Sequence, residues 1–492
     1  MAGWKNERTV QTEEGGEKSA DAVDEPAIPK ISSNAADFYR AKPVLDRRIH
    51  IMGVGNVGCF VAHALRGIPN APPVTLIFSR WDKLHKWNES SQRLTLVTDG
   101  DSEIRDGYDA EVAFPRIRFH GKEVGLNNTT QEETEGSSGA QQQASQPLSG
   151  ESSEPISSLI ICSKAPYVLQ GLSAVKHRLN KDSVVLFMLN GMGTVEEVNR
   201  EIFPDPATRP HYMLGINSHG MHHTPGDPFT TVHAGFGTIS LGILPHERDR
   251  AKEAPYAPVM KFKANPADAP VYPEPPEELD PEYPPPATTN VPWTPNQRYL
   301  LRTLLRTPVL SAAAFSPPDL LQMQLEKLAV NCVVNPLTVM LDGRNGSILY
   351  NYALTRTLRL LLAEISLVIR SLPELQYIPN VSQRFDPGRL ESKVVSVAQQ
   401  TKDNISSTLA DVRAGKQTEI DYINGWIVKR GEELGIRCLC NYMMVNLVKG
   451  KANFIKLETG DGVPFVEGNR QGDLDIMGKQ AVSEQYDEGE KL

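Results

Sequence analysis

The chain has 492 residues and a formal net charge of −9, from 51 Lys and Arg against 60 Asp and Glu. This length exceeds what one hydrophobic core usually organises, so at least two domains are expected. The acidic balance provides no basic surface for nucleic acid or for an anionic membrane. No apolar run approaches the roughly 20 residues of a membrane span. We therefore expect a soluble protein with no nucleic-acid and no membrane partner.

Residues 1–45 form a polar, acidic segment with little apolar periodicity, which predicts a disordered tail. The segment lacks the apolar core of a secretory signal, and its acidic residues argue against a mitochondrial transit peptide. The five cysteines are scattered and lie mostly inside apolar runs, which is typical of thiols in a reducing compartment. The cytoplasm is the expected location, although a mitochondrial address stays open.

The stretch from residue 49 to residue 80 predicts a strand, a glycine turn, a helix and a second strand. The predicted dinucleotide-binding turn consists of Gly53, Val54, Gly55, Asn56, Val57 and Gly58. In such a turn the first glycine permits the bend, the second lets a pyrophosphate approach the backbone, and the third lets helix and strand pack closely. The amino end of the following helix favours phosphate. The alternative, a structural glycine turn without a ligand, is the weaker one in this context.

The second strand of this stretch ends at Ser79 and Arg80, with Lys83 nearby. An NAD site usually has Asp or Glu there for the ribose 2′-hydroxyl, whereas a hydroxyl beside a guanidinium suits a 2′-phosphate. We therefore expect NADPH/NADP as the cofactor. The other interpretation is that Arg80 is an ordinary solvated loop charge.

We expect residues 46–316 to form this NADP-binding Rossmann domain. Further strands are predicted at 94–97, 117–119, 159–162, 184–188, 212–217, 230–244 and 309–315, with helices at 168–179 and 299–305. Two segments interrupt the pattern, a Gln- and Ser-rich insertion at about 125–155 and a Pro-rich insertion at about 245–295. His219, His222 and His223 lie among turn residues, so we expect a polar loop and no metal site.

Two of the predicted strands end in polar residues, Lys164 and Asn190. Ligands of open α/β sheets bind outside the carboxyl ends of the strands, so both residues are candidates for contact with cofactor or substrate. Ordinary loop polarity is an equally good explanation of each residue taken alone.

Residues 317–457 predict an all-α domain, and residues 458–492 a second disordered tail. The expected helices span 320–334, 349–372, 390–399, 405–413, 419–434 and 441–454. Pro336 should end the first of them, because proline disfavours the helical conformation of the residue before it. The fold class is thus an α/β Rossmann domain followed by an all-α domain.

Lys327, Asn331 and Asn335 are four residues apart and lie on one helix face in apolar surroundings. Such a stripe either faces a wet cleft or forms a buried structural network. Glu419, taken alone, is best explained as an acid in the first turn of a helix. Asn404, Ser406 and Ser407 are first explained as helix-capping residues.

Four segments of the chain resemble the ketopantoate reductase (2-dehydropantoate 2-reductase) family. They are residues 327–338 (KLAVNCVVNPLT), residues 418–425 (TEIDYING), residues 404–407 (NISS) with 411–413 (DVR), and residues 190–193 (NGMG). The resemblance covers roughly residues 48–452, apart from the two insertions. It implies a helical domain like that of 6-phosphogluconate dehydrogenase, with substrate bound between the two domains.

The resemblance also implies a function, which is NADPH-dependent reduction of ketopantoate to pantoate in the pantothenate pathway. Lys327 matches the family's catalytic lysine and Glu419 its active-site glutamate. Positions that match substrate-binding residues are Asn190, Asn331, Asn335, Ser407 and Asn404. Arg80 matches the 2′-phosphate reader, and Lys164 and Asn190 match residues near the nicotinamide.

Two alternatives stay open. One is reduction of a related 2-oxo acid on the same scaffold, since nothing in the sequence measures the substrate pocket. The other is a dinucleotide-binding scaffold that acts through protein partners, which the long polar insertions suggest. A homodimer is also left open.

Overall fold

The computed structural model describes residues 46–114, 117–119, 122–124, 151–224, 226–246 and 293–459. These residues belong to one compact unit that begins at Asp46. The first predicted tail, and nearly all of the two insertions and of the second tail, lie outside the described residues. The exceptions include residues 458 and 459, which continue the last helix instead of starting the tail.

Eight strands of the described chain form the main sheet, in the order β14-β13-β10-β9-β8-β1-β2-β5. They are β1 (Ile49–Met52), β2 (Val74–Phe78), β5 (Tyr108–Val112), β8 (Ser158–Ile161), β9 (Val184–Phe187), β10 (His211–Asn217), β13 (Ile239–Ile243) and β14 (Ala312–Ala314). Neighbouring strands are parallel, except that β10 and β13 are antiparallel. Strand β1 lies between β2 and β8, so the chain order reverses there. The carboxyl end of β1 is therefore the place where open α/β sheets bind ligands.

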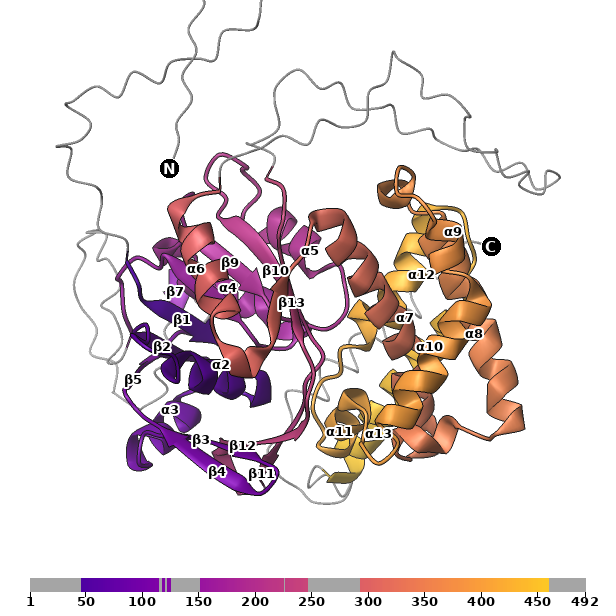
Figure 1. The fold of residues 1–492 in the computed structure, drawn as a ribbon, viewed down its shortest axis with the longest axis horizontal. Coiled ribbons are helices and arrows are strands. Elements are labelled where there is room, and N and C mark those ends of the chain that lie inside the picture. Colours follow the sequence, from indigo (N-terminus) through magenta and orange to yellow (C-terminus); the bar gives the residue numbers. More distant parts are fainter. Residues whose placement is uncertain are drawn as a thin grey trace, which may run out of the picture. The chain divides into compact units, whose positions relative to one another are not determined.

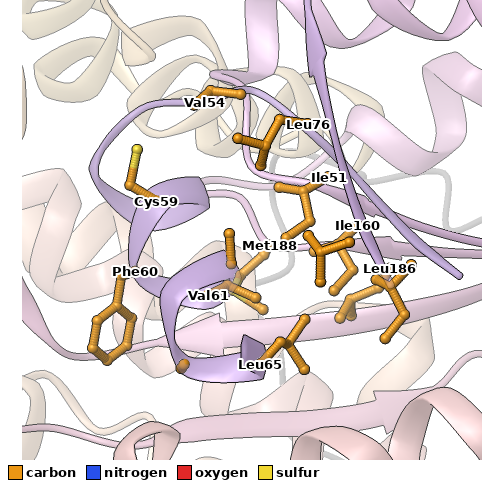
Figure 2. Close-up of a cluster of buried hydrophobic side chains, with 14 of the residues drawn as sticks. Ile51, Val54, Cys59, Phe60, Val61, Leu65, Leu76, Ile160, Leu186 and Met188 are labelled. Carbon is orange, nitrogen blue, oxygen red and sulfur yellow. The ribbon is translucent and has the colours of Figure 1, made fainter. Parts of the chain in front are cut away.

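Helices cover both faces of this sheet, and every residue of its central strands is therefore buried. On one face, Ile51, Ile160 and Leu186 belong to a cluster that includes helices α2 (Asn56–Arg66) and α6 (Pro295–Leu305). Figure 2 shows these side chains against α2. The alternate strand residues pack with α4 (Val168–Val175) and α5 (Thr194–Glu201) instead. The two-residue period of the strands thus divides the core into two layers.

Further strands flank the main sheet (Figure 1). A second sheet has the order β11-β12-β3-β4, formed by β11 (Gly220–Thr224), β12 (Asp227–Gly235), β3 (Leu94–Thr98) and β4 (Asp101–Arg105). Strands β6 (Ile117–Phe119) and β7 (Lys122–Val124) form a hairpin, and α3 (Trp81–Glu89) follows β2. The expected polar loop at the histidines is wrong, because His222 and His223 lie in β11 and pair with β12.

The described residues after 316 contain helices and turns and no strand, which confirms the all-α prediction. The helices are α7 (Pro317–Leu341), α8 (Tyr352–Arg370), α9 (Val381–Arg384), α10 (Pro387–Gln400), α11 (Ser407–Arg413), α12 (Asn424–Glu433) and α13 (Leu439–Thr459). Short 3-10 helices are η1 (Ala165–Tyr167), η2 (Lys176–Arg178), η4 (Pro308–Leu310), η5 (Asn345–Ile348), η6 (Pro373–Leu375) and η7 (Ile420–Tyr422). None of the helices described is long and apolar enough to cross a bilayer.

Helix α7 continues through Pro336, so the expected end of the helix before this proline is wrong. Proline has no N–H, which leaves the carbonyl of Cys332 without its usual helical donor. Asn424 of α12 supplies the missing bond, since its Nδ2 donates to that carbonyl at 2.8 Å. The same amide donates to Oδ1 of Asn441 in α13 at 2.9 Å. A buried amide from a distant segment therefore stabilises the proline-containing turn.

We expect Asn424→Ala to lower the free energy of unfolding by about 2 kcal/mol, because two buried acceptors lose their donor. Asn446→Ala is the matched control. Among the described residues its amide bonds to one carbonyl, that of Tyr442 on the same exposed helix face, so a change within about 0.5 kcal/mol is expected. Chemical denaturation of the three proteins tests this, and equal losses in the two variants would contradict it.

Candidate active site

The glycine turn after β1 has the geometry that a dinucleotide needs. Gly53 has a φ of +93°, and a Cβ there would lie 2.3 Å from the amide nitrogen of Ser163. A Cβ on Gly58 would lie 2.2 Å from the carbonyl oxygen of Gly53. At Gly55, by contrast, nothing described lies within 4 Å of that position. The first and third glycines are thus required by packing, while the second leaves open space for a ligand.

Two polar atoms beside this turn support the same interpretation. Oδ1 of Asn56 and Oγ of Ser163 are buried, and neither has a hydrogen-bond partner among the described residues. Unpaired buried polar atoms are rare in folded proteins. A hydroxyl can donate to a phosphate, and an amide oxygen can accept from a ribose hydroxyl. The side chain of Val54 belongs to the core, so that residue can offer a ligand only its backbone.

The carboxyl ends of β2, β8 and β9 lie at the same edge of the sheet as this turn. Arg80 follows β2 and is exposed, and its guanidinium makes two 2.8 Å bonds to the carboxylate of Asp82. Lys164 follows β8 and forms an ion pair with Asp411 of α11. Asn190 follows β9 and donates from Nδ2 to Oε2 of Glu419 at 3.1 Å.

Glu419 lies where the sheet edge meets the helical segments, and it is not in the first turn of a helix. It precedes η7, and its side chain is buried, with the residue 6% exposed. Oε1 accepts from the backbone N–H of Ala165 at 3.1 Å, and Oε2 accepts from Asn190. Burial raises the pKa of Glu419 above its usual range, while these two donors oppose the shift. The explanation as a simple helix acid is therefore wrong.

Lys327 lies in α7, and its Nζ donates to the backbone carbonyl of Asn217 at the end of β10, 2.6 Å away. Burial lowers the pKa of Lys327 to about 8, and the negative charge of Glu419 opposes that shift. A lysine with a pKa near neutral can both hold and release a proton under ordinary conditions. The lysine and the glutamate thus form an electrostatically coupled pair.

The remaining predicted residues differ in their surroundings. Asn331 and Asn335 follow Lys327 on α7 at four-residue spacing, the first half-buried and the second buried. Ser407 begins α11 and is exposed, as is Asn404 before it. The capping role belongs to neither of these two but to Ser406, whose hydroxyl accepts from the N–H of Leu409.

Sequence reasoning missed Asp411 and the carbonyl of Asn217. Asp411 is buried, and burial raises its pKa, while the ammonium of Lys164 opposes this. Its spacing of four residues from Ser407 puts both on one face of α11, which is the signal that could have identified it. No sequence signal marks a backbone carbonyl, because every residue has one.

Comparisons with known proteins identify the family of this chain. The family model described as "Ketopantoate reductase PanE/ApbA" matches residues 49–246, and the one for the C terminal of the same family matches residues 319–452. A probable 2-dehydropantoate 2-reductase of Schizosaccharomyces pombe is 27% identical over 300 residues, which cover 61% of this chain and 75% of the relative.

A second fungal relative and a solved structure complete the comparison. The ketoisovalerate reductase BEA2 of Gibberella fujikuroi is 25% identical over 452 residues, covering 84% of this chain and 85% of that protein. The crystal structure of a PanE/ApbA family ketopantoate reductase from Ralstonia eutropha JMP134 superposes with a TM-score of 0.53 at 17% identity, covering 83% of this chain and 99% of the other. The chain is therefore an oxidoreductase and belongs to the ketopantoate reductase family.

Proposed function

We propose that this chain reduces 2-dehydropantoate (ketopantoate) to (R)-pantoate with NADPH, a step of pantothenate and coenzyme A biosynthesis. The observation that carries the proposal is the place of Lys327 and Glu419 beside the carboxyl ends of neighbouring strands. Glu419 accepts from Ala165 after β8 and from Asn190 after β9, and Lys327 donates to the carbonyl of Asn217 at the end of β10. The family's own name supports the substrate. Under this proposal, residues 46–316 form the cofactor-binding domain and residues 317–457 the helical domain that supplies the acid.

Lys327 is the general acid of the proposed reaction. Reduction of a ketone develops negative charge on the carbonyl oxygen, and an ammonium group placed there stabilises that charge and donates the proton. In the structure this ammonium already donates to the carbonyl of Asn217, so one of its three N–H groups is fixed in direction. This bond holds the ammonium in place, so one of its other two N–H groups can reach the substrate oxygen with less reorganisation.

Glu419 has two roles in the proposed site. Its negative charge favours the ammonium form of Lys327, which counteracts the effect of burial. Its carboxylate can also accept a hydrogen bond from the hydroxyl of ketopantoate, a group that simpler 2-oxo acids lack. Asn190 and Ala165 hold that carboxylate in place. We assign Asn331, Asn335, Ser407 and Asn404 to orienting the substrate's carboxylate and hydroxyl.

NADPH, when bound, supplies the hydride. The turn from Gly53 to Gly58 would hold its pyrophosphate, because Gly55 leaves space there and the hydroxyl of Ser163 beside the turn has no partner among the described residues. Oδ1 of Asn56 would accept from a ribose hydroxyl. Arg80 would bind the 2′-phosphate, and Lys164 and Asn190 would lie near the nicotinamide. Lys164 is kept at the sheet edge by its ion pair with Asp411.

A second candidate is reduction of ketoisovalerate. The Gibberella fujikuroi relative with that name matches 84% of this chain, against 61% for the Schizosaccharomyces pombe relative. Both reactions use the same acid and the same cofactor, so the substrate hydroxyl is what separates them. We favour ketopantoate because buried Glu419 offers that hydroxyl a charged acceptor. A binding scaffold without catalysis is the weaker explanation, since the chain belongs to an oxidoreductase family.

Lys327→Ala should lower kcat for ketopantoate reduction by about 10²- to 10⁴-fold, the usual size of a lost general acid. The dissociation constant for NADPH should stay nearly unchanged, since none of the proposed cofactor contacts involves this side chain. Lys456→Ala, which removes an exposed lysine of α13, is the control and should leave both quantities unchanged. Unchanged turnover in Lys327→Ala would refute the assignment of the acid.

The proton on Lys327 should be lost as the pH rises through about 8, so kcat for reduction should fall above that pH. Glu419→Gln removes a charge that raises the pKa of Lys327 and should therefore move the titration to lower pH. An NMR titration of ¹³C-methylated lysines measures this independently of turnover, with Lys327→Arg to assign the signal. Glu391→Gln, which removes a half-buried acid of α10 that pairs with Arg359, is the charge-matched control. If the pKa of Lys327 is the same in Glu419→Gln as in the parent protein, the charge of Glu419 does not act on Lys327.

A further inference from the structure

Arg80 and Asp82 form a two-bond ion pair at the start of α3. Nε of Arg80 lies 2.8 Å from Oδ1 of Asp82, and Nη2 lies 2.8 Å from Oδ2. The planar guanidinium therefore presents one edge to both oxygens of the carboxylate. The same kind of two-bond contact is the one with which an arginine binds a phosphate. In the described structure Asp82 is therefore bonded to the guanidinium of Arg80, the group that we propose binds the cofactor's 2′-phosphate.

The Arg80–Asp82 pair lies where a bound dinucleotide would place its adenosine ribose. In dinucleotide folds, the end of the second strand faces the 2′-position of the adenosine ribose. A carboxylate there accepts a hydrogen bond from a 2′-hydroxyl, whereas an arginine there binds a 2′-phosphate. This chain has one residue of each kind there, two positions apart and bonded to each other. Asp82 lies in the first turn of α3, beyond the strand end where the acid of an NAD site usually lies.

The surroundings of Asp82 are positively charged. Lys83 is the next residue, and its pKa is lowered by desolvation and by the charges of Arg80 and Lys416. Lys416 comes from the segment after α11, so both the α/β part and the helical part contribute basic groups near this place. A phosphate would be attracted there even while Asp82 holds the arginine, because the local charge stays positive.

We propose that Asp82 sets the enzyme's choice between NADPH and NADH by competing with the 2′-phosphate for Arg80. This inference rests on the proposed NADPH-binding site. With NADPH, the 2′-phosphate takes the guanidinium and Asp82 becomes a nearby like charge, which weakens binding. With NADH, Asp82 keeps Arg80 and its carboxylate accepts a hydrogen bond from the 2′-hydroxyl, which strengthens binding. Asp82 is thus a residue that limits NADPH selectivity and permits use of NADH.

The test is the affinity of full-length Asp82→Asn for each nucleotide, measured by isothermal titration calorimetry without substrate. We expect the dissociation constant for NADPH to fall by about threefold to tenfold and that for NADH to rise by about the same factor. The effect on NADPH should shrink at high salt, because the pair is exposed, with 66% and 48% of the two side chains accessible. Opposite changes for the two nucleotides are the signature of competition.

Glu201→Gln is the matched control. Glu201 pairs with Arg200 at 2.8 Å, and these side chains have similar exposures of 60% and 52%. The pair lies at the carboxyl end of α5, whereas the amino end of that helix is the one that follows the sheet edge. This variant removes the same charge and should leave both affinities unchanged.

Two results would overturn the inference. If the parent protein binds NADPH but Asp82→Asn changes neither affinity, or changes both in the same direction, Asp82 does not set the selectivity, and the proposed function still stands. If the parent protein binds neither nucleotide, the cofactor site itself is wrong, and the role of Asp82 falls with it.

Discussion

The site depends on how the charge of Glu419 is held. A carboxylate buried this deeply is stable only if donors replace the water that it has lost. The two donors to its carboxylate, the N–H of Ala165 and the amide of Asn190, belong to the sheet edge, while Glu419 itself belongs to the helical region. The same charge keeps Lys327 of α7 closer to its ammonium form. One buried carboxylate thus connects the end of the sheet, the helical segments and the proposed acid.

The parts of the fold that the sequence predicts well are those governed by local periodicity. The strand, glycine turn and helix from Ile49 to Arg66 follow from an apolar run, three glycines and a helical pattern, and all of this information is local. The expected strand at 309–315, by contrast, splits into a 3-10 turn and the short strand β14. The sequence predicts that α7 ends before Pro336. This is wrong because the carbonyl of Cys332, which the proline leaves without a helical donor, accepts a hydrogen bond from Asn424, far away in the chain.

The candidate site divides in the same way. Lys327 and Glu419 could be proposed from a family resemblance, and their coupling is a property of the folded chain alone. The pairing of Lys164 with Asp411 joins residues 247 positions apart, so no local pattern reports it. The sequence predicts Arg80 as a phosphate reader, and the structure adds its two bonds to Asp82, which that prediction did not include. Such contacts arise from tertiary structure, and sequence patterns do not report them.

The most direct test of the account is the oxidation of NADPH by purified protein, followed by nicotinamide absorbance, with ketopantoate and ketoisovalerate in parallel. We predict NADPH oxidation with ketopantoate at a kcat/KM about a hundredfold or more above that for ketoisovalerate, because a site that binds the substrate hydroxyl discriminates against its absence. A preference for ketoisovalerate would transfer the assignment to the second candidate. No oxidation with either acid, by protein that binds NADPH, would contradict the account.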